Sequence, residues 1–302
     1  MYGTVRPRIG QGAARPRRPG IPRFPCSPPA GIVGAARRNA RPGCRAGRSP
    51  REEPMQGTEP HISLVIPAFN EGRRIAPTVR ETVAYLGNNG YAYEVIVVDD
   101  GSTDSTYDVV RHIQREVPQL GIVRHPVNLG KGCAVKSGFL AARGDFVFFT
   151  DADHSTPIEE LPKFMARAHE GFDIVIASRA MPDSVIAVPQ AWYRQRMGCA
   201  FNWLVRALVI GGIRDTQCGF KCFRRERCAP IFAVQRLRGF SFDVEILFLA
   251  RRLGLRIIEL PVVWRNSADS RVHTLKDSLR MFRDLLRIRW NSLRGKYRAA
   301  QA

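Results

Sequence analysis

An apolar run ends in two acids separated by one residue in the stretch Phe146-Val147-Phe148-Phe149-Thr150-Asp151-Ala152-Asp153. Its aromatic and β-branched residues are typical of a strand that is buried on both faces. In extended backbone, residues two positions apart face the same side, so Asp151 and Asp153 can share one cation. The stretch therefore predicts a buried strand that delivers two carboxylates to the carboxyl edge of a sheet, where open α/β sheets bind ligands.

Strand patterns recur at a regular interval after residue 60. Apolar runs end near residues 67, 98, 125, 151 and 177. Such an interval is what successive βα units require. We therefore predict an α/β fold with a mostly parallel, doubly wound, Rossmann-like sheet and helices on both faces. The strands are expected at 61–67, 93–98, 122–125, 146–151, 172–177 and 256–263, and the helices at 77–87, 103–117, 130–142, from a capping box at 156–159 onward, at 192–210, at 242–253 and at the C-terminus.

Polar residues follow almost every predicted strand. They are Asn70 and Glu71, Asp99 and Asp100, Lys131, Asp151 and Asp153, and Arg179. Because the carboxyl ends of parallel strands meet at one edge of a sheet, we expect these side chains to converge on one rim. This rim is the predicted ligand site.

Much of the positive charge lies near the N-terminus. The chain has 302 residues, 44% of them apolar, and a formal net charge of +20. Residues 1–60 hold twelve Arg and three Glu, together with eleven of the 21 prolines, and show no apolar periodicity. Such a composition cannot bury enough surface to fold. We therefore predict that residues 1–58 are a disordered Arg/Pro-rich extension.

Three interpretations of this extension compete. It is an arm that binds RNA or anionic lipid, a spacer, or upstream sequence included because the start codon was assigned too early. We favour the third, because Met55 directly precedes the first strand and Arg51-Glu52-Glu53 is encodable by a purine-rich ribosome-binding sequence. The intact mass of the protein made from its native gene decides between a start at Met1 and a start at Met55.

Cysteine usage and hydropathy indicate a cytoplasmic protein. The seven cysteines include a cluster at Cys218, Cys222 and Cys228, but no paired C-x-x-C motif or nearby histidine set indicates zinc. We interpret them as reduced thiols. The sequence has neither an apolar run of about 18 residues, which a membrane-spanning helix needs, nor the apolar core of a signal peptide. We therefore expect no transmembrane helix and no signal peptide.

The C-terminal segment 271–302 is predicted to form a basic amphipathic helix. It carries nine Lys and Arg against two Asp. An apolar stripe recurs at steps of three and four, with arginines among it: Leu275, Leu279, Phe282, Leu286, Trp290 and Leu293, with Arg280, Arg283, Arg287 and Arg294. Two interpretations are open. The stripe lies in the headgroup region of anionic lipid, or it covers the sheet and leaves a basic outer face.

The triplet Asp151-Ala152-Asp153 has three interpretations by itself. The acids are solvated loop residues, or the nucleophile and general acid of a haloacid-dehalogenase-type phosphatase, or ligands of a Mg²⁺ or Mn²⁺ ion that bridges them to a nucleotide diphosphate. In the phosphatases the motif usually opens the domain, whereas other βα units precede it here. The motifs around the triplet favour the third interpretation.

Four motifs occur in order at βα spacing. They are Val65-Ile66-Pro67-Ala68-Phe69-Asn70-Glu71, Val97-Val98-Asp99-Asp100-Gly101-Ser102-Thr103-Asp104, Asn128-Leu129-Gly130-Lys131-Gly132 and Thr150-Asp151-Ala152-Asp153. Together they resemble the nucleotide-sugar half of family 2 glycosyltransferases, which have the GT-A fold, over residues 61–180. Two later segments, 214–223 and 240–245, resemble the dolichyl-phosphate β-glucosyltransferase branch, close to the polyprenyl-phosphate mannose synthases. The resemblance covers about 61–295 and implies a GT-A domain at 59–270, with a nucleotide-sugar half at 59–180 and an acceptor half at 181–270.

The resemblance also implies roles for individual residues. Asp151 and Asp153 would hold Mg²⁺ or Mn²⁺, and Arg179 and Asp215 would join them as the catalytic set. The residues expected to border the nucleotide sugar are Pro67, Phe69, Glu71, Asp99, Asp100, Lys131, Asp151 and Ala152. Each has a structural alternative as well. For example, Lys131 is a solvated residue at a helix start, and Asp215 caps its own turn instead of orienting acceptor or metal.

A lipid phosphate would act as the acceptor without a general base. Its second pKa is about 6, so it is largely dianionic at neutral pH and can attack the sugar carbon directly. The site then has to stabilise the leaving diphosphate and to bring two anionic substrates together. The candidate cations for the acceptor phosphate are Arg179, Arg194, Arg196, Arg265 and Arg271.

We therefore predict a metal-dependent inverting glycosyltransferase. It would move glucose from UDP-glucose to a polyprenyl (dolichyl-type) phosphate, as a peripheral protein on the cytoplasmic face of an anionic membrane. Use of GDP-mannose, or of another acceptor, is the alternative within this class. The alternative from another class is a non-catalytic protein whose basic segments contact nucleic acid. On the favoured interpretation, no specific nucleic acid is a partner.

Overall fold

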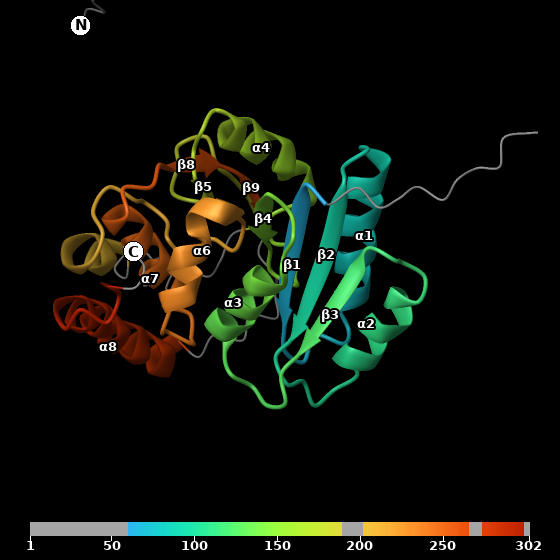
Figure 1. Cartoon of the computed structure of the whole chain (residues 1–302), viewed down its shortest axis with the longest axis horizontal. Helices are drawn as coiled ribbons and strands as arrows, with labels where there is room; N and C mark the ends of the chain where they lie inside the picture. The colour runs from blue at the N-terminus through green and yellow to red at the C-terminus, as the bar shows by residue number, and fades with distance from the viewer. Residues whose placement is uncertain (1–59, 189–201, 266–273, 299–302) are drawn as a thin grey trace, which may run out of the picture. The chain divides into compact units, whose positions relative to one another are not determined.

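The computed structural model describes residues 60–188, 202–265 and 274–298, which belong to one compact unit (Figure 1). The predicted extension 1–58 lies outside the described residues, as does most of the predicted helix 192–210. Three of the candidate phosphate-binding residues, Arg194, Arg196 and Arg271, lie outside them too.

A seven-stranded sheet forms the centre of the described fold, in the order β3-β2-β1-β4-β7-β5-β8. The strands are β1 (Ile62–Ala68), β2 (Tyr93–Asp99), β3 (Leu120–Arg124), β4 (Phe146–Phe149), β5 (Ile174–Ser178), β7 (Lys221–Arg224) and β8 (Ile257–Pro261). Neighbouring strands are parallel except at β7, which is antiparallel to both β4 and β5. The prediction of a mostly parallel α/β sheet is confirmed.

The antiparallel strand β7 has no counterpart among the predicted elements. It is four residues long, Lys-Cys-Phe-Arg, and such a short segment carries no periodicity that separates it from a loop. The single strand predicted at 256–263 is in fact two, β8 and β9 (Val263–Arg265). β9 pairs in parallel with β6 (Val185–Val188), which is also unpredicted, to form a separate two-stranded sheet.

The helices surround the sheet in the order that the βα pattern predicts. They are α1 (Ile75–Asn88), α2 (Thr106–Gln114), α3 (Lys131–Ala141), the short 3₁₀ helix η1 (Ile158–Glu160), α4 (Leu161–His169), α6 (Arg225–Val234), α7 (Phe242–Arg252) and α8 (Thr274–Leu293), and residues 202–208 are helical as well. Among the described helices, none combines the length and the apolar character that crossing a membrane requires.

One local prediction about helices is wrong, and one helix was not predicted. The capping box at Thr156–Glu159 does not form, because Thr156 is buried and its hydroxyl contacts Cys218 Sγ at 3.8 Å, while α4 begins after Glu160 without a side-chain cap. Helix α6 is absent from the predicted elements, and it contains Pro230, which normally argues against a helix interior.

Alternating strand residues face two hydrophobic cores on opposite sides of the sheet. On β4, Phe146 and Phe148 point into the core that packs against α1, α2 and α4. Val147 and Phe149 point into the other core, which packs against α3, α6 and α7. Full burial of each such side chain stabilises the fold by about 1.5–3 kcal/mol. The helices therefore cover both faces of the sheet, as predicted (Figure 1).

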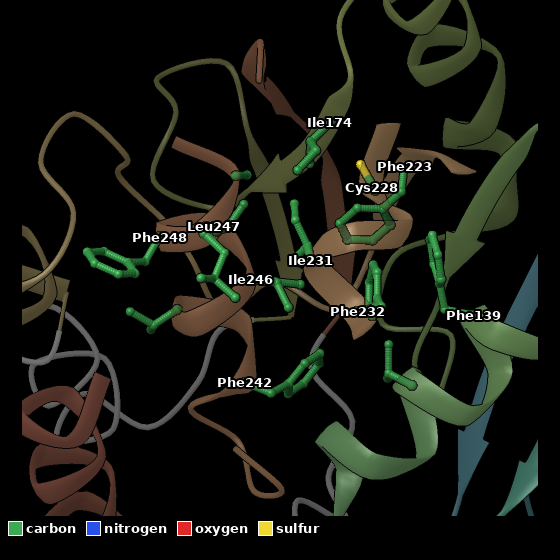
Figure 2. Packing of buried hydrophobic residues seen from close by; sticks show 14 of the residues in the cluster. Phe139, Ile174, Phe223, Cys228, Ile231, Phe232, Phe242, Ile246, Leu247 and Phe248 are labelled. Carbon is green, nitrogen blue, oxygen red and sulfur yellow. The ribbon is translucent and has the colours of Figure 1, made fainter. Parts of the chain in front are cut away.

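The second core joins the first half of the chain to the second. Figure 2 shows Phe139 of α3, Phe223 of β7 and Phe232 of α6 packed together. The rings of Phe139 and Phe232 stack with centroids 3.8 Å apart, and Phe223 meets Phe232 edge-on at 5.4 Å. These contacts hold β7 in place between β4 and β5, so the segment that leads into β7 lies close to the acids that follow β4.

The close packing of α3 on the sheet predicts a difference between two helical glycines. A Cβ at Gly138 would lie 2.2 Å from Cγ1 of the buried Val65, whereas a Cβ at Gly87 of α1 would find its nearest neighbour at 3.6 Å. We expect Gly138→Ala to lower the free energy of unfolding by about 1–3 kcal/mol through overpacking. The control Gly87→Ala should leave it unchanged or raise it by up to about 1 kcal/mol. Urea denaturation of both variants tests this, and equal midpoints would contradict it.

Candidate active site

A cavity of about 570 Å³ lies at the carboxyl edge of the sheet. Six polar residues expected at this rim line it: Glu71, Asp100, Lys131, Asp151, Asp153 and Arg179. Pro67, Phe69 and Ala152 line it as well. The sheet therefore brings together side chains that are more than a hundred residues apart in the sequence.

Asp151 faces the cavity and forms an ion pair with Lys131. The distance between Lys131 Nζ and Asp151 Oδ1 is 2.6 Å. Burial acts to lower the pKa of Lys131, but the nearby carboxylates of Asp151 and Asp243 outweigh it and raise that pKa. The lysine is therefore a charged partner of the acid and not a solvated residue at a helix start.

Gly219 provides the space that the Asp151 carboxylate occupies. A Cβ at Gly219 would lie 1.9 Å from Asp151 Oδ2. This distance is too short for any side chain, so a larger residue at this position would have to move the acid. Gly219 has no predicted role in the site. It lies in the segment 214–223 that carries the family resemblance, and the pairing of β7 with β4 brings this segment beside Asp151.

Helix α1 fixes the backbone of the loop that carries the two acids. Thr78 Oγ1 donates a hydrogen bond to the carbonyl oxygen of Ala152 at 2.7 Å. His154 adopts a φ of 50° and hydrogen-bonds to Thr82 Oγ1 at 3.1 Å and Glu81 Oε2 at 3.0 Å. A positive φ is uncommon for a residue other than glycine, and these contacts hold it. Asp151 and Asp153 are thus held on a rigid turn.

The two acids after β2 have different environments. Asp100 lines the cavity, and its carboxylate is hydrogen-bonded to His125 Nδ1 at 2.7 Å and accepts from the backbone N–H of Gly130 at 2.8 Å. Asp99 is fully buried, lies 3.3 Å from Arg124 Nε and accepts from the Ser102 N–H, so it stands behind the rim. Of the two residues expected to border the nucleotide, the geometry favours Asp100.

Arg179 is clamped by Asp215. The Nε and Nη2 atoms of Arg179 donate to the two carboxylate oxygens of Asp215 at 2.7 and 3.0 Å, and Trp264 lies 5.4 Å from the guanidinium. Burial acts to raise the pKa of Asp215, but the charge of Arg179 outweighs it and lowers that pKa. Asp215 is 1% exposed and also accepts from the Gln217 N–H, so it caps its turn and acts on the cavity only through Arg179.

Asp243 of α7 is a further acid on the cavity wall, and it has no predicted role. Its Oδ1 lies 2.6 Å from Nζ of Lys221, which is fully buried on β7 and also donates to the carbonyl oxygen of Cys218 at 2.6 Å. Burial raises the pKa of Asp243, while Lys221 and Lys131 act to lower it. The residue belongs to the segment 240–245 that carries the family resemblance, and this is the signal in the sequence that pointed toward it.

The remaining predicted phosphate ligand lies elsewhere. Arg265 is exposed on β9, where its backbone N–H donates to the carbonyl oxygen of Ser155, and it does not line the cavity. Instead, α8 contributes Arg280, Met281 and Asp284 to the wall. In the sequence these three residues lie between the residues of the apolar stripe from which the helix was predicted. Only the packing of the helix shows that they face the cavity.

The acids fit a divalent cation of the Mg²⁺ or Mn²⁺ type. Hard carboxylate oxygens suit these ions, which usually take one or two protein carboxylates and complete their coordination with phosphate oxygens and water. The described residues contain no cluster of three or more acidic, histidine or cysteine side chains that would enclose an ion. The cation that already contacts Asp151, the Lys131 ammonium, shows that this carboxylate accepts positive charge from the cavity side.

Residues 63–226 match the family model described as glycosyl transferase family 2. The chain belongs to glycosyl transferase family 2. It is 37% identical over 240 residues to a dolichyl-phosphate beta-glucosyltransferase of Trichomonas vaginalis, in an alignment that covers 76% of this chain and 72% of the relative. It is 34% identical to the dolichyl-phosphate beta-glucosyltransferase of Saccharomyces cerevisiae, over 82% of this chain and 79% of the relative.

Solved structures share the fold of this family 2 glycosyltransferase. The glucosyl-3-phosphoglycerate synthase of Mycobacterium tuberculosis in complex with UDP superposes with a TM-score of 0.56 at 23% identity, over 76% of this chain and 78% of that one. The same synthase with Mn²⁺, UDP and glucosyl-3-phosphoglycerate gives a TM-score of 0.54. The predicted GT-A fold is confirmed. Since the chain is a glycosyltransferase, the alternative of a non-catalytic nucleic-acid-binding protein is set aside.

The contact between Gly219 and Asp151 predicts a loss of glycosyl transfer on adding one methyl group. Gly219→Ala should displace the Asp151 carboxylate by about 1 Å and lower turnover by about a hundredfold, with little change in melting temperature. Gly211→Ala is the matched control, because its Cβ would find nothing closer than 3.9 Å. Steady-state kinetics and thermal melting of both variants test this. A Gly219→Ala enzyme as fast as the wild type would contradict the proposed position of the acid.

Proposed function

We propose that this glycosyltransferase moves glucose from UDP-glucose to a polyprenyl phosphate of the dolichyl type and inverts the sugar configuration. The supporting observation is that one cavity presents an acid pair for a metal–diphosphate complex and a fixed arginine for a second phosphate. The names of the relatives, dolichyl-phosphate beta-glucosyltransferases at 33–37% identity, support the same donor sugar and acceptor class.

The donor would lie in the part of the cavity that is lined by the residues following β1, β2 and β4. Pro67, Phe69, Glu71 and Asp100 would border its nucleoside, and Asp151 and Asp153 would hold Mg²⁺ or Mn²⁺. When bound, the metal would neutralise charge that develops on the leaving diphosphate. The Lys131 ammonium and the N-terminus of α3 would add positive charge next to the same group.

The acceptor phosphate would bind at Arg179. Asp215 takes two of the guanidinium N–H groups and fixes the orientation of the side chain, and further N–H groups remain for a phosphate. A phosphate monoester with a second pKa of about 6 is already a nucleophile at neutral pH. In-line attack on the α-linked sugar of UDP-glucose then yields a β-linked product, and no side chain has to remove a proton.

The C-terminal helix is proposed to hold the protein on the cytoplasmic face of an anionic membrane. From Leu279 onward the apolar stripe of α8 is exposed, with Leu279 at 73%, Trp290 at 54% and Leu293 at 82%, while Leu285 and Ile288 are fully buried. These exposed stripe residues do not pack against the protein, whereas Leu285 and Ile288, on a different face of α8, join the core that also contains residues of α7. Exposed apolar side chains with arginines between them suit the headgroup region.

Removal of either acid or of the metal should abolish transfer. With radiolabelled UDP-glucose and a polyprenyl phosphate, we expect label in the organic phase, and loss of at least about a hundredfold in Asp151→Ala, in Asp153→Ala and with EDTA. The exposed Asp108→Ala is the matched control. Retained turnover in either acid variant would refute the metal role. GDP-mannose and non-lipid phosphate acceptors are tested in the same assay. Faster turnover of GDP-mannose would overturn the proposed donor, and faster turnover of a non-lipid phosphate would overturn the proposed acceptor.

Membrane association should depend on the exposed stripe. We expect Phe282→Ser with Trp290→Ser to lower binding to phosphatidylserine vesicles at least about tenfold, since each buried aromatic contributes about 1.5–3 kcal/mol. The matched control is Leu140→Ser on α3, an exposed apolar residue at 60%. Flotation assays measure both, and added salt should weaken wild-type binding through the arginines. Unchanged flotation of the double variant would exclude this face of α8.

A further inference from the structure

Lys131 contacts the same carboxylate that is proposed to bind the divalent metal. The ammonium lies 2.6 Å from Asp151 Oδ1, and the lysine and aspartate side chains are 20% and 33% exposed. A Mg²⁺-type ion binds carboxylate oxygen at about 2.0–2.1 Å. Two cations at such distances from one carboxylate group lie close together and repel each other in a partly buried site. The ammonium and the metal therefore compete for Asp151.

The backbone of Lys131 is fixed, while its side chain is long and rotatable. Gly130 has a φ of 100°, and a Cβ there would lie 2.5 Å from the carbonyl oxygen of Arg238. The Gly132 N–H donates to that same oxygen at 2.7 Å, so the turn that carries Lys131 is closely packed. A lysine ammonium is a point charge on a flexible four-carbon stem. It can change partners within the cavity while the turn stays in place.

The charges beside Asp151 favour loading of the metal together with a diphosphate. Three acids, Asp151, Asp153 and Asp243, face two lysines, Lys131 and Lys221, so this cluster of five side chains carries one net negative charge. The neighbouring pair of Arg179 and Asp215 is neutral. A divalent ion alone would reverse the charge of this cluster and displace the ammonium, and the nearest remaining acid, Asp243, already pairs with Lys221. A metal–diphosphate complex of balanced charge leaves the total unchanged, and its phosphate oxygens give the ammonium a new anion.

We propose that Lys131 is a resident counter-ion that competes with the divalent metal for Asp151 and transfers to the diphosphate of the donor, so that the site takes up metal and nucleotide sugar together. The inference rests on the proposed metal site at Asp151 and Asp153. Lys131 thereby weakens binding of metal alone and strengthens binding of nucleotide. A residue that merely supports the fold would weaken both.

Mn²⁺ binding to the intact protein without nucleotide tests the proposal. The signal of free Mn²⁺ in electron paramagnetic resonance gives the affinity directly. We expect Lys131→Met to bind Mn²⁺ between about five- and 150-fold more tightly than the wild type, the usual range of coupling between two ligands. Lys131→Arg keeps the positive charge and should stay near the wild-type affinity. With saturating Mn²⁺, Lys131→Met should bind UDP more weakly by a similar factor in calorimetric titration.

Two further variants separate this effect from a general change of charge. Lys163→Met removes a lysine that pairs with Glu160 away from the cavity, and it should leave Mn²⁺ affinity unchanged. Asp151→Ala in the Lys131→Met background should cancel the gain. Wild-type Mn²⁺ affinity in Lys131→Met, or a loss of both ligands, would overturn the competition while leaving the proposed function intact. Failure of the wild type to bind Mn²⁺ even with UDP would overturn the metal site itself.

Discussion

The buried ion pair between Lys221 and Asp243 connects the two halves of the fold at the active site. Lys221 lies on the antiparallel strand β7 and Asp243 on α7, and both side chains are almost completely buried with 2.6 Å between Nζ and Oδ1. Removal of one partner would leave an uncompensated buried charge, which costs about 3–5 kcal/mol. This pair fixes α7 against β7, the strand that lies beside β4. The position of Gly219 against Asp151, two residues before Lys221, follows from it.

Three acids of the site each have their own counter-ion. Lys221 pairs with Asp243, Lys131 with Asp151, and Arg179 with Asp215. Such fixed pairs orient charge before substrates arrive, which is how enzymes stabilise developing charge with little reorganisation. The three pairs differ in accessibility. Lys221 is sealed in the core, whereas Lys131 and Arg179 face the cavity and would exchange partners with two different phosphate groups on the proposed function.

Helix α8 connects the cavity with the outer surface of the protein. Its inner face supplies Arg280, Met281 and Asp284 to the cavity, and its outer face carries the exposed apolar stripe. The turn after the helix is fixed by Tyr297, whose hydroxyl donates to Glu245 of α7 at 2.6 Å. Glu245 also accepts from the Leu237 N–H, so one buried carboxylate orders both α8 and a loop beside the cavity. On the proposed function, a lipid tail in the membrane and its phosphate in the cavity would meet along this helix.

The βα order, the convergence of polar residues at one sheet edge and the family could all be predicted from the sequence. These features depend on short periodic patterns and on motifs that are contiguous in the chain. Tertiary structure alone decided that β7 runs antiparallel between β4 and β5, that Gly219 makes room for Asp151, and that Asp215 stands behind Arg179. It also decided which face of α8 is buried. Each of these depends on contacts between residues far apart in the chain. Steric fit and charge pairing between such residues leave no pattern in the local sequence.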